Sequence, residues 1–149
     1  GMVWLNVIAG PVCDDSGQPI HFLIMVEDIS PRKQAELHQA LILRTIPDPL
    51  WFKDMAGRYV LWSDAFLALH RRSAAEVAGR RAAEIMAPSL AAGVEESDAI
   101  VLATRQPFQR ERRAAAPEFD GERWLDTTKT LVCDEDGQPL GIIGITRDI

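Results

Sequence analysis

Two stretches of the chain carry the same pattern of apolar runs around a short polar turn. Near the amino terminus, apolar-rich runs flank residues 13–19, Cys-Asp-Asp-Ser-Gly-Gln-Pro. Near the carboxyl terminus, similar runs flank residues 133–139, Cys-Asp-Glu-Asp-Gly-Gln-Pro. Asp and Gly supply turn hydrogen bonds and positive φ, and Pro can open a returning strand because it needs no donor there. Each stretch therefore predicts a β-hairpin.

The two hairpins form an internal repeat with a period of 120 residues. When residues 3–29 are placed above residues 123–149 without a gap, 10 of the 27 positions are identical. Ordinary composition would give about one match in fifteen. Because the matches include the turn and both strand ends, we interpret the hairpins as two copies of one structural unit.

A helix is predicted directly after the first hairpin. Ser30 can cap it, and Pro31 suits its first position because the missing N–H costs nothing there. Good helix formers and an apolar stripe follow over residues 32–46, and Pro47 ends the helix. The stripe has two interpretations: it packs on its own domain, or it pairs with the same helix of a second copy.

Strand-like and helix-like patterns follow one another in a definite order along the rest of the chain. Two strands come first, several short helices follow, and three strands come last. This order predicts an α+β domain with a five-stranded antiparallel sheet, with the short helices on one face and the connector helix before it. The predicted strands are 50–53, 59–62, 108–113, 122–132 and 140–149, and the predicted helices begin at Ser63, Ser73 and Pro88, with a further turn at 82–86.

The order and its motifs resemble the PAS sensor family, together with the PAC segment that completes its sheet. The resemblance rests on Ile-Pro-Asp-Pro-Leu-Trp-Phe-Lys-Asp at 46–54, on the Ser-x-x-Glu-x-x-Gly turn at 73–79, and on the closing Arg-Asp-Ile at 147–149. The first hairpin ends in Asp-Ile-Ser, which is similar to the Asp-Ile-Thr exit of a PAS domain. The resemblance implies three parts: the closing hairpin of an upstream PAS repeat at 1–29, a helical signalling linker at 30–46, and a PAS domain with its PAC segment at 47–149.

What the resemblance implies is signalling and not catalysis by this chain. We expect a sensory module of a cytoplasmic bacterial signalling protein, which senses a small ligand and passes the signal through helical linkers to an output domain. The expected output is a sensor histidine kinase of a phosphorelay. The alternative is a ligand-free PAS dimerisation module of a diguanylate cyclase or phosphodiesterase.

Charge and hydropathy narrow the set of partners. Sixteen basic and 22 acidic residues give a net charge of −6 and a pI near 5.0, whereas a nucleic-acid binder would carry a basic excess. The longest uninterrupted apolar run, at 22–26, is far shorter than the ~20 residues that span a bilayer. We therefore expect no nucleic acid and no direct membrane insertion. The expected partners are a second copy, through the 30–46 helix, the sheet or both, and a small-molecule ligand.

The histidines do not indicate an active site. His38 superficially resembles a phosphoacceptor histidine, but Gln39 follows it in place of an acidic residue and Pro47 lies nine positions on. His21 falls on a returning strand, where the second copy has Gly141. His70 falls at the end of a predicted helix, where a solvated cation would complement the helix dipole.

No cofactor or metal is predicted. The predicted helix at 88–105 contains no histidine that could ligate a haem, and no cysteine lies between Cys13 and Cys133 to supply the flavin motif of a photoactive PAS domain. Non-covalent haem or flavin is not expected either. Two cysteines are too few for a metal site, and their equivalent strand-end positions predict buried structural thiols.

A small-molecule site is the remaining candidate for chemistry. Successive strand residues point to opposite faces, so Arg110 and Arg112 share one face of their strand, and Asp126 and Thr128 share one face of the next. If these faces line a cavity, arginine could pair with an anionic ligand and threonine could donate a hydrogen bond. The alternative is a solvated face with cross-strand Arg–Asp pairs. The candidate ligand-binding residues are Tyr59, Arg110, Arg112, Trp124, Asp126 and Thr128.

Signal coupling is predicted at the exit of each hairpin. We expect Asp28 to pair with Arg32 across the junction between strand and helix and so to set the direction in which the helix leaves. Ser30 belongs to the same junction, and Asp148 occupies the equivalent position in the second copy.

Overall fold

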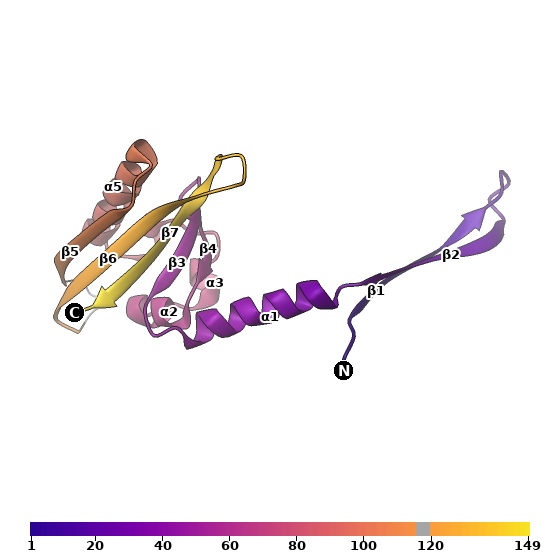
Figure 1. The fold of residues 1–149 in the computed structure, drawn as a ribbon, viewed down its shortest axis with the longest axis horizontal. Helices are drawn as coiled ribbons and strands as arrows, with labels where there is room; N and C mark the ends of the chain where they lie inside the picture. Colours follow the sequence, from indigo (N-terminus) through magenta and orange to yellow (C-terminus); the bar gives the residue numbers. More distant parts are fainter. Residues whose placement is uncertain (116–119) are drawn as a thin grey trace. The chain divides into compact units, whose positions relative to one another are not determined.

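The chain folds into two compact units. The computed structural model describes residues 1–115 and 120–149, and it divides the chain at residue 41, with one unit at 1–41 and the other at 42–149. Figure 1 shows the elements of both units in chain order.

The smaller unit is a two-stranded antiparallel hairpin followed by a helix. Strand β1 (Leu5–Cys13) pairs with β2 (Pro19–Asp28), and helix α1 (Ser30–Thr45) follows directly. The side chain of Asp14 closes the turn, because its Oδ1 accepts the backbone N–H groups of Ser16 at 2.9 Å and Gln18 at 3.0 Å. The predicted hairpin and helix are both present.

The second hairpin, of β6 (Glu122–Cys133) and β7 (Pro139–Asp148), repeats the first in register. Leu125 is opposite Asp148 as Leu5 is opposite Asp28, and both hairpins have an irregularity at the cysteine beside the turn. Asp134 closes the second turn with the same two kinds of hydrogen bond that Asp14 makes in the first. The sequence repeat is therefore a repeat of one hairpin structure.

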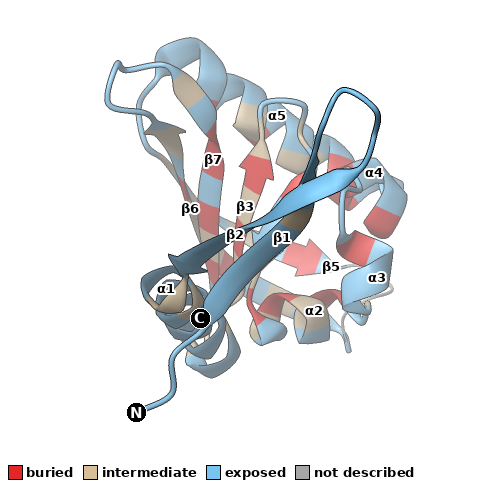
Figure 2. Ribbon diagram, turned by 90° about the vertical axis from the view of Figure 1, so that its right-hand side faces the viewer, coloured by how far each residue is buried: buried red, intermediate tan, exposed pale blue. Residues whose placement is uncertain are grey.

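The larger unit is built on a five-stranded antiparallel sheet with strand order β4-β3-β7-β6-β5. Four helices connect β4 to β5 and gather on one face of the sheet (Figures 1 and 2). The predicted α+β fold is confirmed. The remaining elements are β3 (Leu50–Asp54), β4 (Tyr59–Trp62), α2 (Asp64–His70), α3 (Ala74–Val77), α4 (Ala82–Ile85), α5 (Pro88–Thr104) and β5 (Phe108–Ala115).

Short polar side chains set the helix starts that the sequence predicts. The buried Ser63 hydroxyl accepts the N–H of Phe66 at 3.2 Å and that of Leu50 at 2.9 Å, so it both caps α2 and ties it to β3. Ser73 and Glu76 form a capping box at the start of α3. The long helix α5 begins at a proline, whose missing N–H is unneeded there.

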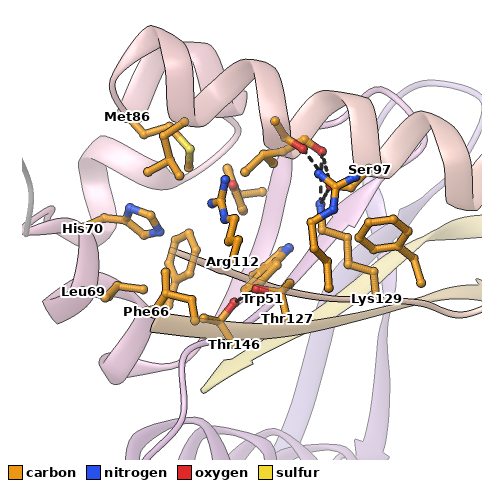
Figure 3. A pocket seen from close by; sticks show the side chains of 17 residues that line it. Trp51, Phe66, Leu69, His70, Met86, Ser97, Arg112, Thr127, Lys129 and Thr146 are labelled. Atoms are coloured by element: carbon orange, nitrogen blue, oxygen red, sulfur yellow. Dashed lines mark hydrogen bonds between the residues drawn. The ribbon is translucent and has the colours of Figure 1, made fainter. Parts of the chain in front are cut away.

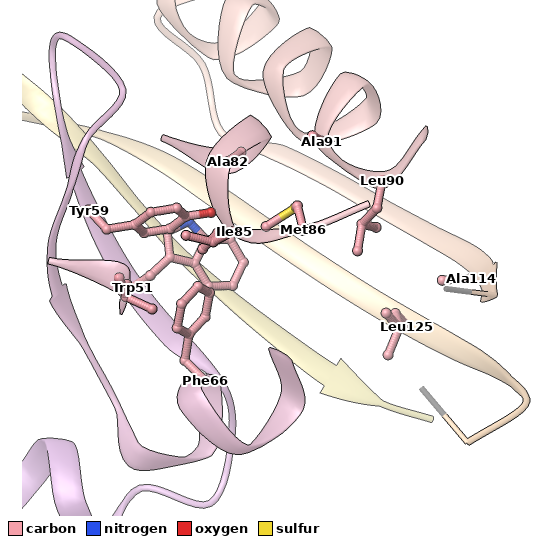
Figure 4. Close-up of a cluster of buried hydrophobic side chains, with 11 residues drawn as sticks. Trp51, Tyr59, Phe66, Ala82, Ile85, Met86, Leu90, Ala91, Ala114 and Leu125 are labelled. Carbon is pink, nitrogen blue, oxygen red and sulfur yellow. The ribbon is translucent and has the colours of Figure 1, made fainter. Parts of the chain in front are cut away.

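A cluster of aromatic and aliphatic side chains lies between the sheet and its helices (Figure 4). Phe66 is central to it: its ring centroid lies 5.6 Å from that of Trp51 and 5.1 Å from that of Tyr59. Burying a side chain of this size contributes about 1.5–3 kcal/mol. The other members of the cluster are Val77, Ala82, Ile85, Met86, Leu90, Ala91, Ala114 and Leu125.

The hairpin of the smaller unit exposes its apolar side chains. Leu5 is 54% exposed, whereas Leu125, the same residue in the same register of the second copy, is 3% exposed. Phe22 on β2 is also exposed, and helix α1 buries none of its residues (Figure 2). The difference arises because the second hairpin has a strand on each side and helices over one face.

Both cysteines are free and exposed, so the prediction of buried thiols is wrong. Cys13 and Cys133 lie where each strand meets its turn, beyond the part of the sheet that other elements cover. The Arg105 guanidinium contacts the Cys133 Sγ at 3.7 Å.

Two glycines of β7 allow β3 to approach closely. A Cβ added at Gly144 would lie 2.4 Å from the Cζ2 atom of Trp51, and one added at Gly141 would lie 2.0 Å from the Lys53 carbonyl oxygen. The Trp51 indole therefore packs directly on the backbone of β7. The first hairpin has Ile24 at the position equivalent to Gly144.

Replacing Gly144 with alanine should destabilise the larger unit by about 1–3 kcal/mol, because the added methyl overpacks the Trp51 ring. Phenylalanine lacks the indole atoms that the methyl would meet, so the double variant Gly144→Ala, Trp51→Phe should lose less stability than the two single losses together. Chemical denaturation of all four proteins measures this. The control is Gly10→Ala, which adds its methyl where nothing lies within 4 Å. An unchanged unfolding midpoint for Gly144→Ala would contradict the packing described.

Candidate functional site

A small cavity of about 50 Å³ lies between the inner face of the sheet and the helices (Figure 3). Every strand of the larger unit contributes to its wall, and so do α2 and α5. Most of the lining is apolar, but basic side chains from β5 and β6 interrupt it. The lining residues are Trp51, Tyr59, Phe66, Leu69, His70, Met86, Leu90, Gly93, Val94, Ser97, Phe108, Arg110, Arg112, Leu125, Thr127, Lys129 and Thr146.

An ionic cluster at one side of the cavity joins two strands to helix α5. Lys53 of β3 and Lys129 of β6 are each 2% exposed, and both donate to the carboxylate of Asp98 on α5. The Lys129 ammonium lies 2.5 Å from Asp98 Oδ1. It also lies 2.7 Å from the Ser97 hydroxyl and 3.1 Å from the Val94 carbonyl oxygen (Figure 3). Two buried ammonium groups therefore share one carboxylate.

Burial changes the titration of the groups around this cluster. It lowers the pKa of Lys129 to about 8, and the charges of Lys53 and Arg112 act in the same direction, while the Asp98 carboxylate opposes them. Burial raises the pKa of Tyr59, and the negative charges of Asp98 and Glu95 add to that rise. The tyrosine is therefore neutral at physiological pH.

The two arginines on the inner face of β5 differ in their partners. Arg110 faces Glu96 of α5 at 3.8 Å and stacks on the Phe108 ring at 5.0 Å. Arg112 is half-buried and has no ion pair with a carboxylate among the described residues. Burial lowers the pKa of Arg112, and the positive charge of Arg110 adds to this effect.

Three of the predicted ligand-binding residues line the cavity, and three do not. Tyr59, Arg110 and Arg112 are in its wall. Trp124, Asp126 and Thr128 lie on the opposite face of β6 and are absent from the described lining: Trp124 is 53% exposed, and the Asp126 carboxylate accepts the side-chain N–H of Gln109 at 3.2 Å. The polar face of β6 is the outer one, because the alternate set begins with the buried Leu125.

Sequence reasoning missed the polar residues that share the inner face with apolar ones. On β6 the inner-face residues are Leu125, Thr127, Lys129 and Leu131. The two leucines are the members whose sequence pattern indicates that this face is buried. Lys53 likewise shares the face of Trp51 on β3. The partner, Asp98, lies 45 residues from Lys53 and 31 from Lys129, and no local pattern marks it as buried.

His70 is buried, whereas the sequence predicts a solvated side chain at a helix end. Its ring centroid lies 4.6 Å from that of Phe66, and the side chain lines the cavity. The helix end is instead formed by Arg71, which has a left-handed φ of 51° and an exposed side chain paired with Asp120 at 2.6 Å. The last turn of α2 packs on the core, and this packing decides the position of the histidine.

The predicted pair between Asp28 and Arg32 is wrong. The Asp28 carboxylate accepts the backbone N–H of Ser30 at 2.9 Å, and the Ser30 hydrogen bonds lower the pKa of Asp28. The Ser30 hydroxyl accepts the N–H of Trp4 at 2.8 Å, while Arg32 lies 4.0 Å from Glu36 one turn along α1. Local hydrogen bonds between the aspartate and the helix start thus replace the expected ion pair.

Asp148, the equivalent of Asp28, has a different partner in the second copy. It pairs with Arg123 at 3.2 Å, across β6 and β7. It also lines a second, open hollow of about 420 Å³, together with Pro47, Arg71 and Asp120. The two equivalent aspartates therefore make different contacts.

The described residues, 1–115 and 120–149, offer no candidate metal cluster and no candidate membrane span. These residues contain no group of three His, Cys, Asp or Glu side chains placed to hold a metal ion. None of the helices that they form is both long enough and apolar enough to cross a membrane.

Replacing Asp98 with alanine should destabilise the larger unit by about 3–5 kcal/mol, because it leaves two buried ammonium groups without their shared carboxylate. The matched control is Glu96→Ala, two positions away on α5, whose carboxylate is exposed and pairs with Arg110 at 3.8 Å. Thermal or chemical unfolding of both variants measures the difference. Equal stability of the two variants would contradict a structural role for the ionic cluster.

The stability of the wild-type chain should rise with pH from about 8 toward 9.5. A lysine whose pKa is lowered in the folded state holds fewer protons there than in the unfolded state, so unfolding takes up a proton above pH 8 and becomes less favourable as the pH rises. One such group changes the free energy of unfolding by at most about 1.4 kcal/mol per pH unit. Lys129→Met removes the group, and its unfolding midpoint should vary less over this range. Equal slopes for the two proteins would contradict the lowered pKa.

Comparisons with known proteins agree with this architecture. A sequence profile described as PAS fold matches residues 43–149. The chain is 32% identical over 108 residues to the methanogenesis regulatory histidine kinase FilI of Methanothrix harundinacea (strain 6Ac), a match that covers 72% of this chain and 12% of that protein. The chain therefore spans only a small part of the length of this relative.

Solved structures give the same result. The PAS domain of BvgS from Bordetella pertussis matches with a TM-score of 0.63 and 27% identity, over 78% of this chain and 87% of that one. VqmA bound to DPO matches with a TM-score of 0.65 and 25% identity, over 76% of this chain and 57% of that one. A PAS domain is itself non-catalytic. Because the family profile matches most of its length, the chain belongs to the PAS-fold family.

Proposed function

We propose that the larger unit is the ligand-sensing module of a signalling protein. The observation that carries this proposal is the cavity between the sheet and α5, whose wall combines apolar side chains with a buried ionic cluster. Replacing buried charged residues with apolar ones that fill the same space is often neutral or stabilising, because buried ion pairs contribute little net stability. Charged residues held at a cavity wall are typical of a binding site.

The comparison with VqmA supports ligand binding. That protein, 25% identical to this chain over the matched part, is described as bound to DPO. We propose that the cavity of this chain holds a small ligand in the same general way. The ligand would shift the balance between two packings of α5 on the sheet, because the ionic cluster connects that helix to β3 and β6.

We propose that helical linkers carry the signal onward, with Asp28 and Ser30 as the coupling residues of the first hairpin. Their hydrogen bonds join β1, β2 and the start of α1, so the strand ends and the helix start move together. Arg32 forms a surface pair with Glu36 one turn along α1. Asp148, which lies at the equivalent strand end of the larger unit, is the corresponding coupling residue there.

We further propose that residues 1–29 are the closing hairpin of an upstream repeat of the same fold. The two hairpins share their register and turn hydrogen bonds, and Leu5 is exposed where Leu125 is buried. An isolated two-stranded hairpin is marginally stable in water. Strands and helices equivalent to those around β6 and β7 would cover it.

For the output, we propose a histidine kinase acting in a phosphorelay in the cytoplasm. The support is the 32% identity to a regulatory histidine kinase, although the match covers 12% of that protein. Signal transduction of this type would use the chain as a regulatory input and leave catalysis to another domain.

One observation favours the second candidate function, a ligand-free dimerisation module of a diguanylate cyclase or phosphodiesterase. Helix α1 exposes Leu37 and Leu41, one turn apart, and buries none of its residues. An exposed apolar stripe of this kind fits pairing with a second copy of the same helix. Dimerisation through α1 is compatible with sensing, so bound ligand is what separates the two functions.

Native mass spectrometry of the purified chain tests the proposal, because it measures oligomer mass and bound ligand together. We expect a dimer whose mass exceeds that of its denatured chains by the mass of a small molecule. The dimer should become a monomer in Leu37→Glu, Leu41→Glu and persist in the control Gln39→Glu, which changes an exposed polar residue of the same helix. A dimer without added mass, with no compound of a metabolite library raising its Tm, would overturn ligand sensing in favour of the dimerisation module.

A further inference from the structure

The wall of the cavity carries positive charge without matching negative charge. Its described lining includes the cationic side chains of Arg110, Arg112 and Lys129 and the imidazole of His70, and no aspartate or glutamate. The carboxylates that pair with these cations, those of Asp98 and Glu96, both come from α5. Because the site is partly buried, an uncompensated charge there raises the free energy of the folded state.

Both of these carboxylates already have cationic partners within the protein. Asp98 bridges both Lys53 and Lys129, so one negative charge serves two buried ammonium groups. Glu96 faces Arg110 at 3.8 Å and is exposed to solvent. Three cations thus share two carboxylates around the cavity.

Arg112 is the cation that has no carboxylate among the described residues. It is half-buried, and Figure 3 shows its side chain among the lining residues between α5 and the sheet. A Cβ added at Gly93 of α5 would lie 3.2 Å from Arg112 Nη1. The glycine therefore leaves the space that the guanidinium occupies against the helix.

A second donor in the same wall also lacks an acceptor. The indole N–H of Trp51 is buried and has no hydrogen-bond partner among the described residues. The Thr127 and Thr146 hydroxyls lie 2.8 Å apart and satisfy each other. The wall therefore offers more donors than acceptors, and an unmade buried hydrogen bond destabilises the fold.

We infer that the cavity binds a small carboxylate anion, with the Arg112 guanidinium as its principal partner and the apolar wall around its hydrocarbon end. The inference rests on the proposed sensing function and specifies its ligand class. A planar guanidinium matches a carboxylate in two parallel hydrogen bonds. The aromatic and aliphatic lining, which includes Phe66, Leu90 and Leu125, favours an anion with an apolar end over inorganic phosphate.

The cavity limits the size of this ligand. A water-sized group needs about 10–15 Å³ of such space, so about 50 Å³ holds about four of them. Acetate and propionate, with four and five non-hydrogen atoms, are the matching probes. Ligands this small bind in the micromolar range at best, so an NMR titration suits the measurement.

The test is a titration of the ¹⁵N-labelled chain with acetate and propionate, and with their neutral amides, at constant ionic strength. We expect saturable shifts of α5 and β5 amides with the two anions, and binding more than about tenfold weaker for acetamide and propionamide. Arg112→Gln should weaken anion binding by more than about tenfold. The matched control is Arg113→Gln, the adjacent arginine of β5, which points to the other face and pairs with Glu122. Its affinity should stay within about twofold of wild type.

Several outcomes would overturn the inference. Equal binding of anions and amides, binding of phosphate in preference to both carboxylates, or unchanged affinity in Arg112→Gln would each do so. The comparison of anion and amide uses the wild-type chain, so it decides the question even if a variant fails to fold. A neutral ligand found by native mass spectrometry would refute the carboxylate class and leave the sensing function standing. Failure of both experiments to detect any ligand would refute both.

Discussion

The bridge from Asp98 to two buried lysines is the interaction on which the larger unit depends. It ties α5 to β3 and β6, two strands with β7 between them, and so holds the helix over the sheet. Removing the carboxylate would leave two buried ammonium groups uncompensated, and removing both ammonium groups would leave the carboxylate uncompensated. The three residues therefore act as one unit. The same bridge forms one wall of the cavity, because Lys129 contributes to both. The stability of the larger unit and the proposed ligand binding therefore depend on some of the same side chains.

In the proposed function, this arrangement would couple the occupancy of the cavity to the position of helix α5. An anion beside Arg112 would add the negative charge that the wall lacks, and it would change the balance of forces on the Lys129–Asp98 pair a short distance away. Because the pair holds α5, a ligand with that charge would have different affinities for different positions of the helix. A neutral ligand would not exert this electrostatic effect on the Lys129–Asp98 pair.

The internal repeat shows how one hairpin sequence serves two environments. The turn hydrogen bonds and the register are the same in both copies, because aspartate, glycine and proline act on their immediate neighbours. The copies differ where another strand must come close. Gly144 accepts the Trp51 ring, whereas the first copy has Ile24, so any strand beside the first hairpin must pack with a different side chain at that point.

Local chemistry in the sequence by itself determined the hairpins, the helix starts at Ser63 and Ser73, the order of strands and helices, and the family. It placed Arg110 and Arg112 on one strand face. Only the tertiary structure decided that this face lines the cavity, that β6 turns Lys129 inward and Asp126 outward, and that His70 is buried. Turn and cap preferences act over a few residues and can be recognised in sequence. The partner of a buried charge, such as Asp98 for Lys53, is chosen by which elements pack together across tens of residues.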